Sequence, residues 1–472
     1  MFIADVLGCY DVYKGPRNIE PAAVSGAQWP VNEPSLIVTP MAAATKNLTF
    51  GVTVATTYEQ PYHLARRLST LDHLTKGRVG WNIVTGYLDS AARNLGFSGG
   101  NLSHDERYAM AEEYLQVMYK LWNSSWRDDA VVLDAERGVY TEPSRIREIN
   151  HKGKYYEVPG PHICQPSPQR TPVLLQAGTS KSGKQFAAQH AECIFVAGFS
   201  PQAVAKSVKE IRDMARDVYG RDPKNIKFLA LMTPVLAETS EAAAKKFEDY
   251  SQYGSIEGAL ALFGGWTGID LNKYGDDEEL RQVESNAIRS AVEMWSRSAP
   301  GIPKWTKITI AKNITIGGLG PTVVGNPQEV ADVLEKWVEE ADVDGFNFVC
   351  SLSFSFPVAH IPSLTDSLMC RPTPSSPAPS STLSSSSCLS SASAASSGTT
   401  TPSRAAPTAR TSTVSPARSS PCPSTSPLPT PGRPASRPPM PPSPALTPSS
   451  RRRRLLRPLL KCSSVGIAVR VV

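Results

Sequence analysis

His104 and Tyr108, four residues apart, form the first pair of side chains in this sequence that could do chemistry. Ser103 followed three residues later by Glu106 is a capping-box pattern, which predicts that a helix begins here. Both rings would then lie on one helical face near its positively polarised end. There they could hold an anionic ring edge or a phosphate, or donate to a reactive oxygen. The alternative is two ordinary surface residues of a first turn.

A second candidate site is the segment 176–183, QAGTSKSG, which follows a short apolar run. Small residues and hydroxyls, Ser180 among them, open an expected helix there. Free backbone N–H groups, the helix dipole and hydroxyls favour phosphate binding at such a turn. A plain N-cap with a tight turn gives the same pattern, so both interpretations stay open.

Polar side chains also stand where apolar runs end, at Asp5, Thr56, Asn82 and Thr85. In parallel α/β folds, ligands bind where the strands end, which makes these four residues candidates for a cofactor or substrate site. Trp81, beside Asn82, is expected to belong to the same wall. Asp5 could instead cap a turn.

Several kinds of site have no motif in the sequence. There is no Walker loop, HExxH, GxSxG or Cys/His cluster, so no metal site is expected. The lack of catalytic and metal-binding motifs favours an enzyme whose reactive group is a bound organic cofactor. The 8 cysteines include no CxxC pair, which is typical of reduced thiols and predicts a cytoplasmic protein. No apolar run is long enough to span a membrane, and the amino terminus lacks a signal-peptide pattern.

The charge is distributed unevenly along the 472 residues, whose formal net charge is +6 from 49 Lys and Arg against 43 Asp and Glu. From Arg371 onward there are 13 Lys and Arg and no acid, so the other 36 basic residues face all 43 acids and residues 1–370 carry about −7. Nucleic-acid binding by this acidic part is therefore not expected.

Short apolar runs alternate with helical patterns up to about residue 351. The runs predict buried strands at 2–7, 48–57, 78–85, 173–177, 193–197, 228–236 and 345–349. Helices are predicted to open at Pro34, to occupy 61–74, 104–122, 181–190, 201–219 and 240–253, and to open again at Pro327. Repeated β/α units indicate a parallel α/β fold, either doubly wound or a closed (β/α)8 barrel. The absence of GxGxxG favours the barrel.

Two inserts and a tail interrupt this rhythm. Residues 123–169 and 256–320 are rich in aromatic residues and glycine, and are expected to cover the catalytic end of the barrel domain, residues 1–356. Residues 357–472 are mostly Ser, Pro, Thr, Ala and Arg, and we predict a disordered tail. That tail could be a nuclear address or an RNA-binding arm, or it could be a solvated linker or a translation outside the true reading frame.

Six segments in the same order carry a resemblance over residues 1–350: FIADVLGCYDVY, GAQWPVNEP, TYEQPYHLARRLSTLDHLTKGRVGWNIVTGYLDSAARNLG, HDERYAMAEEYLQVMYKLW, PGPHICQPSPQRTPVLLQAGTS and FAAQHAECIFV. They resemble the nitrilotriacetate and dibenzothiophene-sulfone monooxygenase branch of the bacterial luciferase-like flavin monooxygenases. The resemblance implies a TIM barrel that takes reduced FMN from a separate NAD(P)H-dependent flavin reductase. With O2 it would form a C4a-peroxyflavin and oxygenate a small aminopolycarboxylate, sulfone, sulfide or alkane.

The resemblance also implies roles for individual residues. Asp5, Thr56, His104, Tyr108 and Ser180 match FMN contacts, with Ser180 at the phosphate and with His104 and Tyr108 lining the flavin and its oxygen adduct. Asn82 and Thr85 are expected to face the isoalloxazine or the substrate. A homo-oligomer is expected as well.

The chain departs from the family pattern at both ends. The first β/α unit that precedes the segment matching Phe2–Asp5 in the family is missing, and the tail stands in place of the last barrel helix. Truncated gene models would explain both, and the barrel is expected to have open strand edges beside the gap. Two alternative functions follow: an inactive barrel scaffold with a basic interaction tail, or a deazaflavin-dependent oxidoreductase.

Overall fold

Parallel strands form the centre of the chain in a computed structural model, which describes residues 1–178, 180–280, 301–302, 304–349 and 468–470. The main strands are β1 (Phe2–Ile3), β2 (Phe50–Ala55), β3 (Val79–Val84), β8 (Val173–Gln176), β9 (Cys193–Val196), β10 (Lys227–Leu236) and β12 (Gly345–Val349). All seven predicted strands are thereby confirmed. A further short strand, β11 (Thr322–Gly325), pairs with the second half of β10.

These strands close into a ring. Their hydrogen-bonded order is β10-β12-β13-β1-β2-β3-β8-β9, and β9 pairs with β10 to complete the circle. Every one of these pairings is parallel. A closed parallel sheet of eight strands with helices outside it is the (β/α)8 barrel that the sequence favoured.

The eighth position in the ring is occupied by β13 (Ala468–Arg470), which lies between β1 and β12. Phe2 pairs with Arg470 on one side, and Phe348 pairs with Val469 on the other. The expectation of open edges on β1 and β12 is therefore wrong for the described residues. Unpaired N–H and C=O groups on a strand edge accept any chain segment that can extend beside them. The predicted tail otherwise lies outside the described residues.

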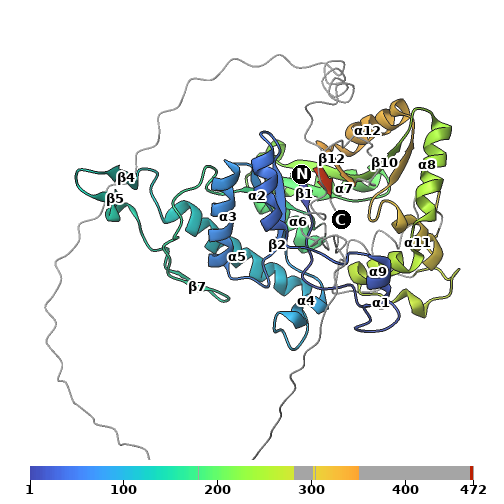
Figure 1. The fold of residues 1–472 in the computed structure, drawn as a ribbon, viewed down its shortest axis with the longest axis horizontal. Helices are drawn as coiled ribbons and strands as arrows, with labels where there is room; N and C mark the ends of the chain where they lie inside the picture. Colours follow the sequence, from blue (N-terminus) through green and yellow to red (C-terminus); the bar gives the residue numbers. More distant parts are fainter. Residues whose placement is uncertain (179, 281–300, 303, 350–467, 471–472) are drawn as a thin grey trace, which may run out of the picture. The chain divides into compact units, whose positions relative to one another are not determined.

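Seven helices follow the sequence prediction: α2 (Pro34–Ala44), α3 (Pro61–Thr75), α5 (His104–Ser124), α6 (Lys181–His190), α7 (Pro201–Asp217), α8 (Ser240–Gln252) and α12 (Pro327–Ala341). Side-chain N-caps or a proline in the first turn start each one. Neighbouring helices contact each other in the order α2, α3, α5, α6, α7, α12, which follows the order of the strands (Figure 1). They form the outer layer of the barrel.

The two inserts add separate elements. The first contains two hairpins, β4 (Val131–Asp134) with β5 (Val139–Thr141) and β6 (His151–Lys152) with β7 (Glu157–Val158); the β4–β5 hairpin projects from the barrel in Figure 1. The second contains α9 (Ile256–Thr267) and α11 (Lys307–Thr315), which pack together, and α9 also packs against α1 (Glu20–Ser25). Its residues 281–300 and 303 are outside the described part.

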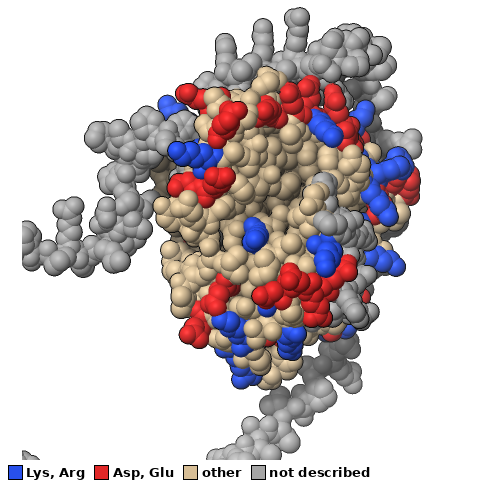
Figure 2. All heavy atoms as spheres, turned by 90° about the vertical axis from the view of Figure 1, so that its right-hand side faces the viewer, with Lys and Arg blue, Asp and Glu red and all other residues tan. Residues whose placement is uncertain are grey.

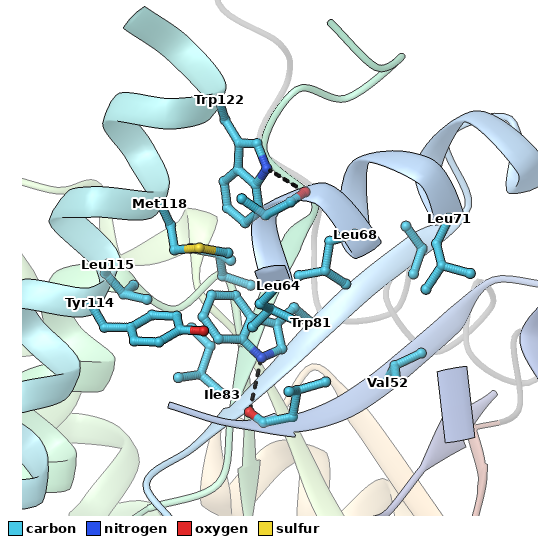
Figure 3. Packing of buried hydrophobic residues seen from close by; sticks show 14 of the residues in the cluster. Val52, Leu64, Leu68, Leu71, Trp81, Ile83, Tyr114, Leu115, Met118 and Trp122 are labelled. Atoms are coloured by element: carbon cyan, nitrogen blue, oxygen red, sulfur yellow. Dashed lines mark hydrogen bonds between the residues drawn. The ribbon is translucent and has the colours of Figure 1, made fainter. Parts of the chain in front are cut away.

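A tryptophan-centred core joins β3 to the helices α3 and α5 (Figure 3). Trp81 is 0% exposed, and its indole N–H donates to the Val54 carbonyl at 3.1 Å. Its ring centroid lies 6.1 Å from that of Tyr114 and 6.4 Å from that of Trp122. The expectation that Trp81 helps to form the ligand wall is therefore wrong. Successive side chains of a strand point to opposite faces, so Trp81 faces the helices while Asn82 faces the barrel interior.

The charged surface is mixed. On the face drawn in Figure 2, Lys and Arg are interspersed with Asp and Glu around a broad uncharged area, without the continuous basic stripe that follows a nucleic-acid backbone. In the described part of the chain, no helix combines the length and the hydrophobicity needed to cross a membrane.

Candidate active site

A cavity of about 260 Å³ opens at the carboxyl end of the strands. Ala4, Ala55, Ala177 and Ala197 line it at the ends of β1, β2, β8 and β9. Four methyl side chains at corresponding strand ends leave space that larger residues would fill. Phe2, Phe195 and Leu231 close the cavity on the side of the barrel core. The chamber is therefore mainly apolar, with few polar groups, as is usual for cofactor sites.

Asp5 is the single charged residue among the described residues that line this cavity. Burial, with the nearby negative charge of Glu33 as a second cause, raises the pKa of the Asp5 carboxyl to about 6. Glu33 is itself held in place as the N-cap of α2, where it accepts a hydrogen bond from the Leu36 N–H at 2.8 Å. Asp5 can therefore gain or lose a proton near neutral pH inside the chamber.

Aromatic side chains line the outer part of the cavity: Tyr10, Tyr58, Tyr87 and Trp266. The hydroxyls of Tyr10 and Tyr87 are 2.7 Å apart and share a hydrogen bond. Trp266 belongs to the second insert, and its ring meets that of Tyr10 edge-on at 6.5 Å. The second insert thus contributes Trp266 to the cavity lining, whereas the described lining includes no residue of the first insert.

Glycines hold two of these rings in position. A Cβ built on Gly265 would lie 2.3 Å from the Tyr10 ring, and one on Gly86 would lie 2.5 Å from the Tyr58 ring. Gly86 also has a φ of +66°, which disfavours other residues. The aromatic wall therefore depends on backbone positions that have no side chain.

His104, Tyr108 and Ser180 meet beside the cavity, where α5 and α6 begin. The Ser180 hydroxyl and His104 Nε2 are 3.1 Å apart, and the His104 and Tyr108 ring centroids are 5.1 Å apart. Burial raises the pKa of the Tyr108 phenol, although hydrogen bonds from Ser180 and Gln176 act in the opposite direction. The predicted position of both rings on one helical face is confirmed, and so is the helix start at Ser103, whose side chain accepts from the Glu106 N–H at 3.3 Å. Ser180 is the N-cap of α6, which is the alternative interpretation of segment 176–183.

A neighbouring acid orients the histidine. His104 Nδ1 lies 2.8 Å from the Asp105 carboxylate, which also accepts a hydrogen bond from the Ser182 hydroxyl at 2.8 Å. When Nδ1 donates to Asp105, Nε2 is left to interact with Ser180 or with a bound anion.

Two glycines shape a concave surface at the same place. A Cβ on Gly178 would lie 2.3 Å from the Tyr108 hydroxyl, and one on Gly183 would lie 2.7 Å from the Gly178 carbonyl oxygen. Only glycine fits at these positions, so backbone and hydroxyl groups are within reach of a ligand. Arg107, 1% exposed, places a positive charge near both Tyr108 and the cavity residue Tyr58, whose pKa burial raises to about 12. The residues present therefore suit a phosphate group joined to a flat ring.

Thr56 and Thr85 do not line the cavity. Thr56 is fully buried, its N–H donates to the Val84 carbonyl at 2.9 Å, and its neighbour Ala55 is the residue that faces inward. Thr85 accepts at its carbonyl from the Thr57 hydroxyl at 2.5 Å, while Val84 faces the cavity. Both threonines lie on the alternate side of their strand ends.

Comparison with known proteins assigns this barrel to a family. The family model described as luciferase-like monooxygenase matches residues 21–345. The chain belongs to the luciferase-like monooxygenase family. It is 50% identical over 353 residues to dimethyl-sulfide monooxygenase of Hyphomicrobium sulfonivorans, covering 75% of this chain and 72% of that protein. It is 46% identical over 349 residues to long-chain alkane monooxygenase of Geobacillus thermodenitrificans, covering 74% of each.

Solved structures agree with this membership. The crystal structure of the Hyphomicrobium sulfonivorans enzyme matches with a TM-score of 0.67 and 51% identity over 74% of this chain and 72% of that chain. That of a long-chain alkane monooxygenase matches with a TM-score of 0.66 and 45% identity over 75% and 76%. The protein is accordingly a flavin-dependent monooxygenase with the TIM-barrel fold of this family.

In this luciferase-like monooxygenase, five of the seven predicted site residues form two groups, and Thr56 and Thr85 belong to neither. Asp5 and Asn82 line the cavity, and His104, Tyr108 and Ser180 form the adjacent polar cluster. Sequence reasoning missed Arg107, Asn347 and the aromatic wall. For Asn347 a signal was available, because it is a lone polar residue between Phe346 and Phe348 in a predicted strand.

Proposed function

We propose that the protein is the oxygenase component of a two-component system, and that it binds reduced FMN and uses O2 to oxygenate a small organic molecule. The observation that carries this proposal is the polar cluster of His104, Tyr108 and Ser180 at two helix N-termini, directly beside a mainly apolar cavity. Helix N-termini with convergent hydroxyl and imidazole groups suit the flavin phosphate, and the cavity suits the ring system.

Different residues of the chain would then bind the phosphate and exclude water. Ser180, His104 and the backbone at Gly178 and Gly183 would hold the phosphate, with Arg107 adding positive charge nearby. The aromatic wall would keep bulk water from the reacting centre. Reduced FMN supplies the electrons that activate O2, and the protein binds, orients and shields it.

A separate NAD(P)H-dependent flavin reductase would supply reduced FMN. One relative, 32% identical over 359 residues, is called nitrilotriacetate monooxygenase component A of Aminobacter aminovorans, and that name implies a second component. We also expect a cytoplasmic homo-oligomer, and light scattering of the purified chain measures its oligomeric state.

We propose a small, uncharged substrate of the sulfide or alkane type. Asp5 is the only charged residue in the described cavity lining, and it would repel an aminopolycarboxylate rather than pair with it. The two relatives with the highest identity given above act, by their names, on dimethyl sulfide and on long-chain alkanes. Product analysis with dimethyl sulfide, an alkane series and nitrilotriacetate, with a flavin reductase present, ranks these classes.

Rapid mixing tests the proposal directly. Purified protein is mixed with photoreduced FMN and then with O2 in a stopped-flow spectrometer. We expect an absorbance transient that outlives the oxidation of free reduced FMN, and weaker binding of a deazaflavin than of FMN. Oxidation at the rate of the free flavin, together with no measurable FMN binding, would refute the proposed function for this chain.

A further inference from the structure

Two asparagine side chains face the cavity from opposite sides of the barrel. Asn82 on β3 is 2% exposed and Asn347 on β12 is 4% exposed, and both line the chamber. In the strand ring β13, β1 and β2 lie between β12 and β3, which places these two strands across the barrel from each other. Within the described structure, the side-chain oxygens of both residues are buried and accept no hydrogen bond.

The orientation of the Asn82 amide follows from its neighbour. The Thr53 hydroxyl donates its one hydrogen to the Ile3 carbonyl at 2.9 Å. It can therefore only accept at its 3.0 Å contact with Asn82, so the group of Asn82 that faces Thr53 is the NH2. The carbonyl oxygen of Asn82 is thereby directed away from Thr53 and left as an acceptor. Thr53 itself lines the cavity, which locates this acceptor at the chamber.

Buried acceptors without donors cost stability, and native proteins contain few of them. A cavity that has two, on facing strands, is matched to a ligand that brings N–H donors. The rest of the inner wall is mainly apolar and includes Phe2, Phe195 and Leu231. A planar ring with N–H groups on its edge satisfies both features, since its faces meet apolar side chains and its edge meets the amides.

We propose that the Asn82 and Asn347 amide oxygens accept hydrogen bonds from N–H groups of the flavin ring, which makes Asn347 a flavin-binding residue. This inference rests on the proposed FMN site and names two residues that hydrogen-bond to the N–H groups of the flavin ring. One of the two amides accepts from N3–H, the donor between the two carbonyls of the pyrimidine edge. Asn347→Leu and Asn82→Leu each remove one acceptor, and Asn225→Leu, at an exposed asparagine, is the matched control.

The experiment compares FMN with 3-methyl-FMN, which has no N3 donor, by fluorescence titration of each protein. We expect the wild type and Asn225→Leu to bind FMN about 10-fold more tightly than 3-methyl-FMN. Oxidised FMN has one ring N–H, at N3, so the variant that lacks the N3–H acceptor should lose about 10-fold in FMN affinity. The other variant should lose affinity only for reduced FMN, which has a further N–H donor at N5, measured by anaerobic titration. In the variant that lacks the N3–H acceptor, FMN and 3-methyl-FMN should bind equally well.

Isosteric variants guard against a folding defect. Asn347→Asp and Asn82→Asp keep an acceptor oxygen, so they should retain the preference for FMN over 3-methyl-FMN, with circular dichroism confirming the fold of every variant. Wild-type FMN affinity in both leucine variants, or an unchanged preference in both, would overturn the inference while leaving the proposed function intact. Failure of the wild type to bind FMN would instead remove the proposed function and this inference with it.

Discussion

Asp5 is the residue whose ionisation most directly affects the cavity. Its folded-state pKa of about 6 lies above its ordinary value of 3.8, so the folded protein holds this proton more tightly than the unfolded chain does. The protonated Asp5 carboxyl therefore stabilises the folded state fully below pH 4, and this stabilisation is lost as the pH rises through 6. At neutral pH the wild type carries a charge that burial and Glu33 disfavour.

We therefore expect Asp5→Asn to become more stable relative to the wild type as the pH rises from 4.5 to 7.5. After allowance for the partial exposure of Asp5, the change is about 1–2 kcal/mol in the free energy of unfolding. Urea denaturation at a series of pH values measures it. In a Glu33→Gln background this pH-dependent gain in stability should occur at lower pH. A stability difference between Asp5→Asn and the wild type that does not vary with pH would show that the raised pKa of Asp5 is not its cause.

His104 should act on the phosphate and not on the ring. We expect His104→Ala to weaken FMN binding about 10-fold through the loss of a charge-assisted hydrogen bond, and to leave riboflavin binding unchanged. Titration with both flavins measures this. His190→Ala is the matched control, because His190 is a half-buried helical histidine bonded to Glu112 and Tyr119. An equal loss for both flavins would place His104 away from the phosphate.

At the scale of elements, strand β3 separates the core from the site. Trp81 fills the space beneath α3 and α5 while the next residue, Asn82, faces the cavity. Trp81→Leu should lower the free energy of unfolding by about 3–5 kcal/mol, because it leaves a cavity and removes the donor to the Val54 carbonyl. Tyr253→Ala, at a side chain 81% exposed, should change it by less than about 0.5 kcal/mol. Equal effects in urea denaturation would refute this packing.

The loop after β3 offers a second test at this scale. In Gly86→Ala, the new methyl group would collide with the Tyr58 ring, and a φ of +66° adds backbone strain. We expect about 1–2 kcal/mol less stability and weaker FMN binding. Gly96→Ala, at a φ of +90° with no atom within 4 Å, should show the strain alone and keep the wild-type FMN affinity. Similar FMN affinities in the two variants would show that Tyr58 does not shape the site.

At the scale of the whole molecule, closure of the barrel depends on β13. Val469→Pro removes a backbone donor from the strand that pairs with both β12 and β1. We expect a loss of about 1–3 kcal/mol in the free energy of unfolding, measured by urea denaturation of the full chain. Val469→Ala, which keeps the N–H, should lose less than the proline variant. Identical stabilities for the wild type and Val469→Pro would show that β13 adds nothing to closure.

Most of the barrel's elements could be predicted from the sequence because their signals are local. Strands β2, β3 and β10 are continuous β-branched and apolar runs, and helices such as α6 and α12 begin at a capping residue or a first-turn proline. The site was partly predictable for the same reason, since Ser180 and His104 lie at helix starts. These local patterns, with the family resemblance they carry, determined the fold class and the kind of enzyme.

The tertiary structure alone decided which of these residues meet. The direction of a strand side chain depends on register, which placed Trp81 in the core and left Thr56 outside the cavity. Asn347 is 265 residues from Asn82 in the chain, and the two share a chamber only because the sheet closes into a ring. Closure joins residues across the whole sequence through strand pairing, and no local pattern specifies such non-local pairs.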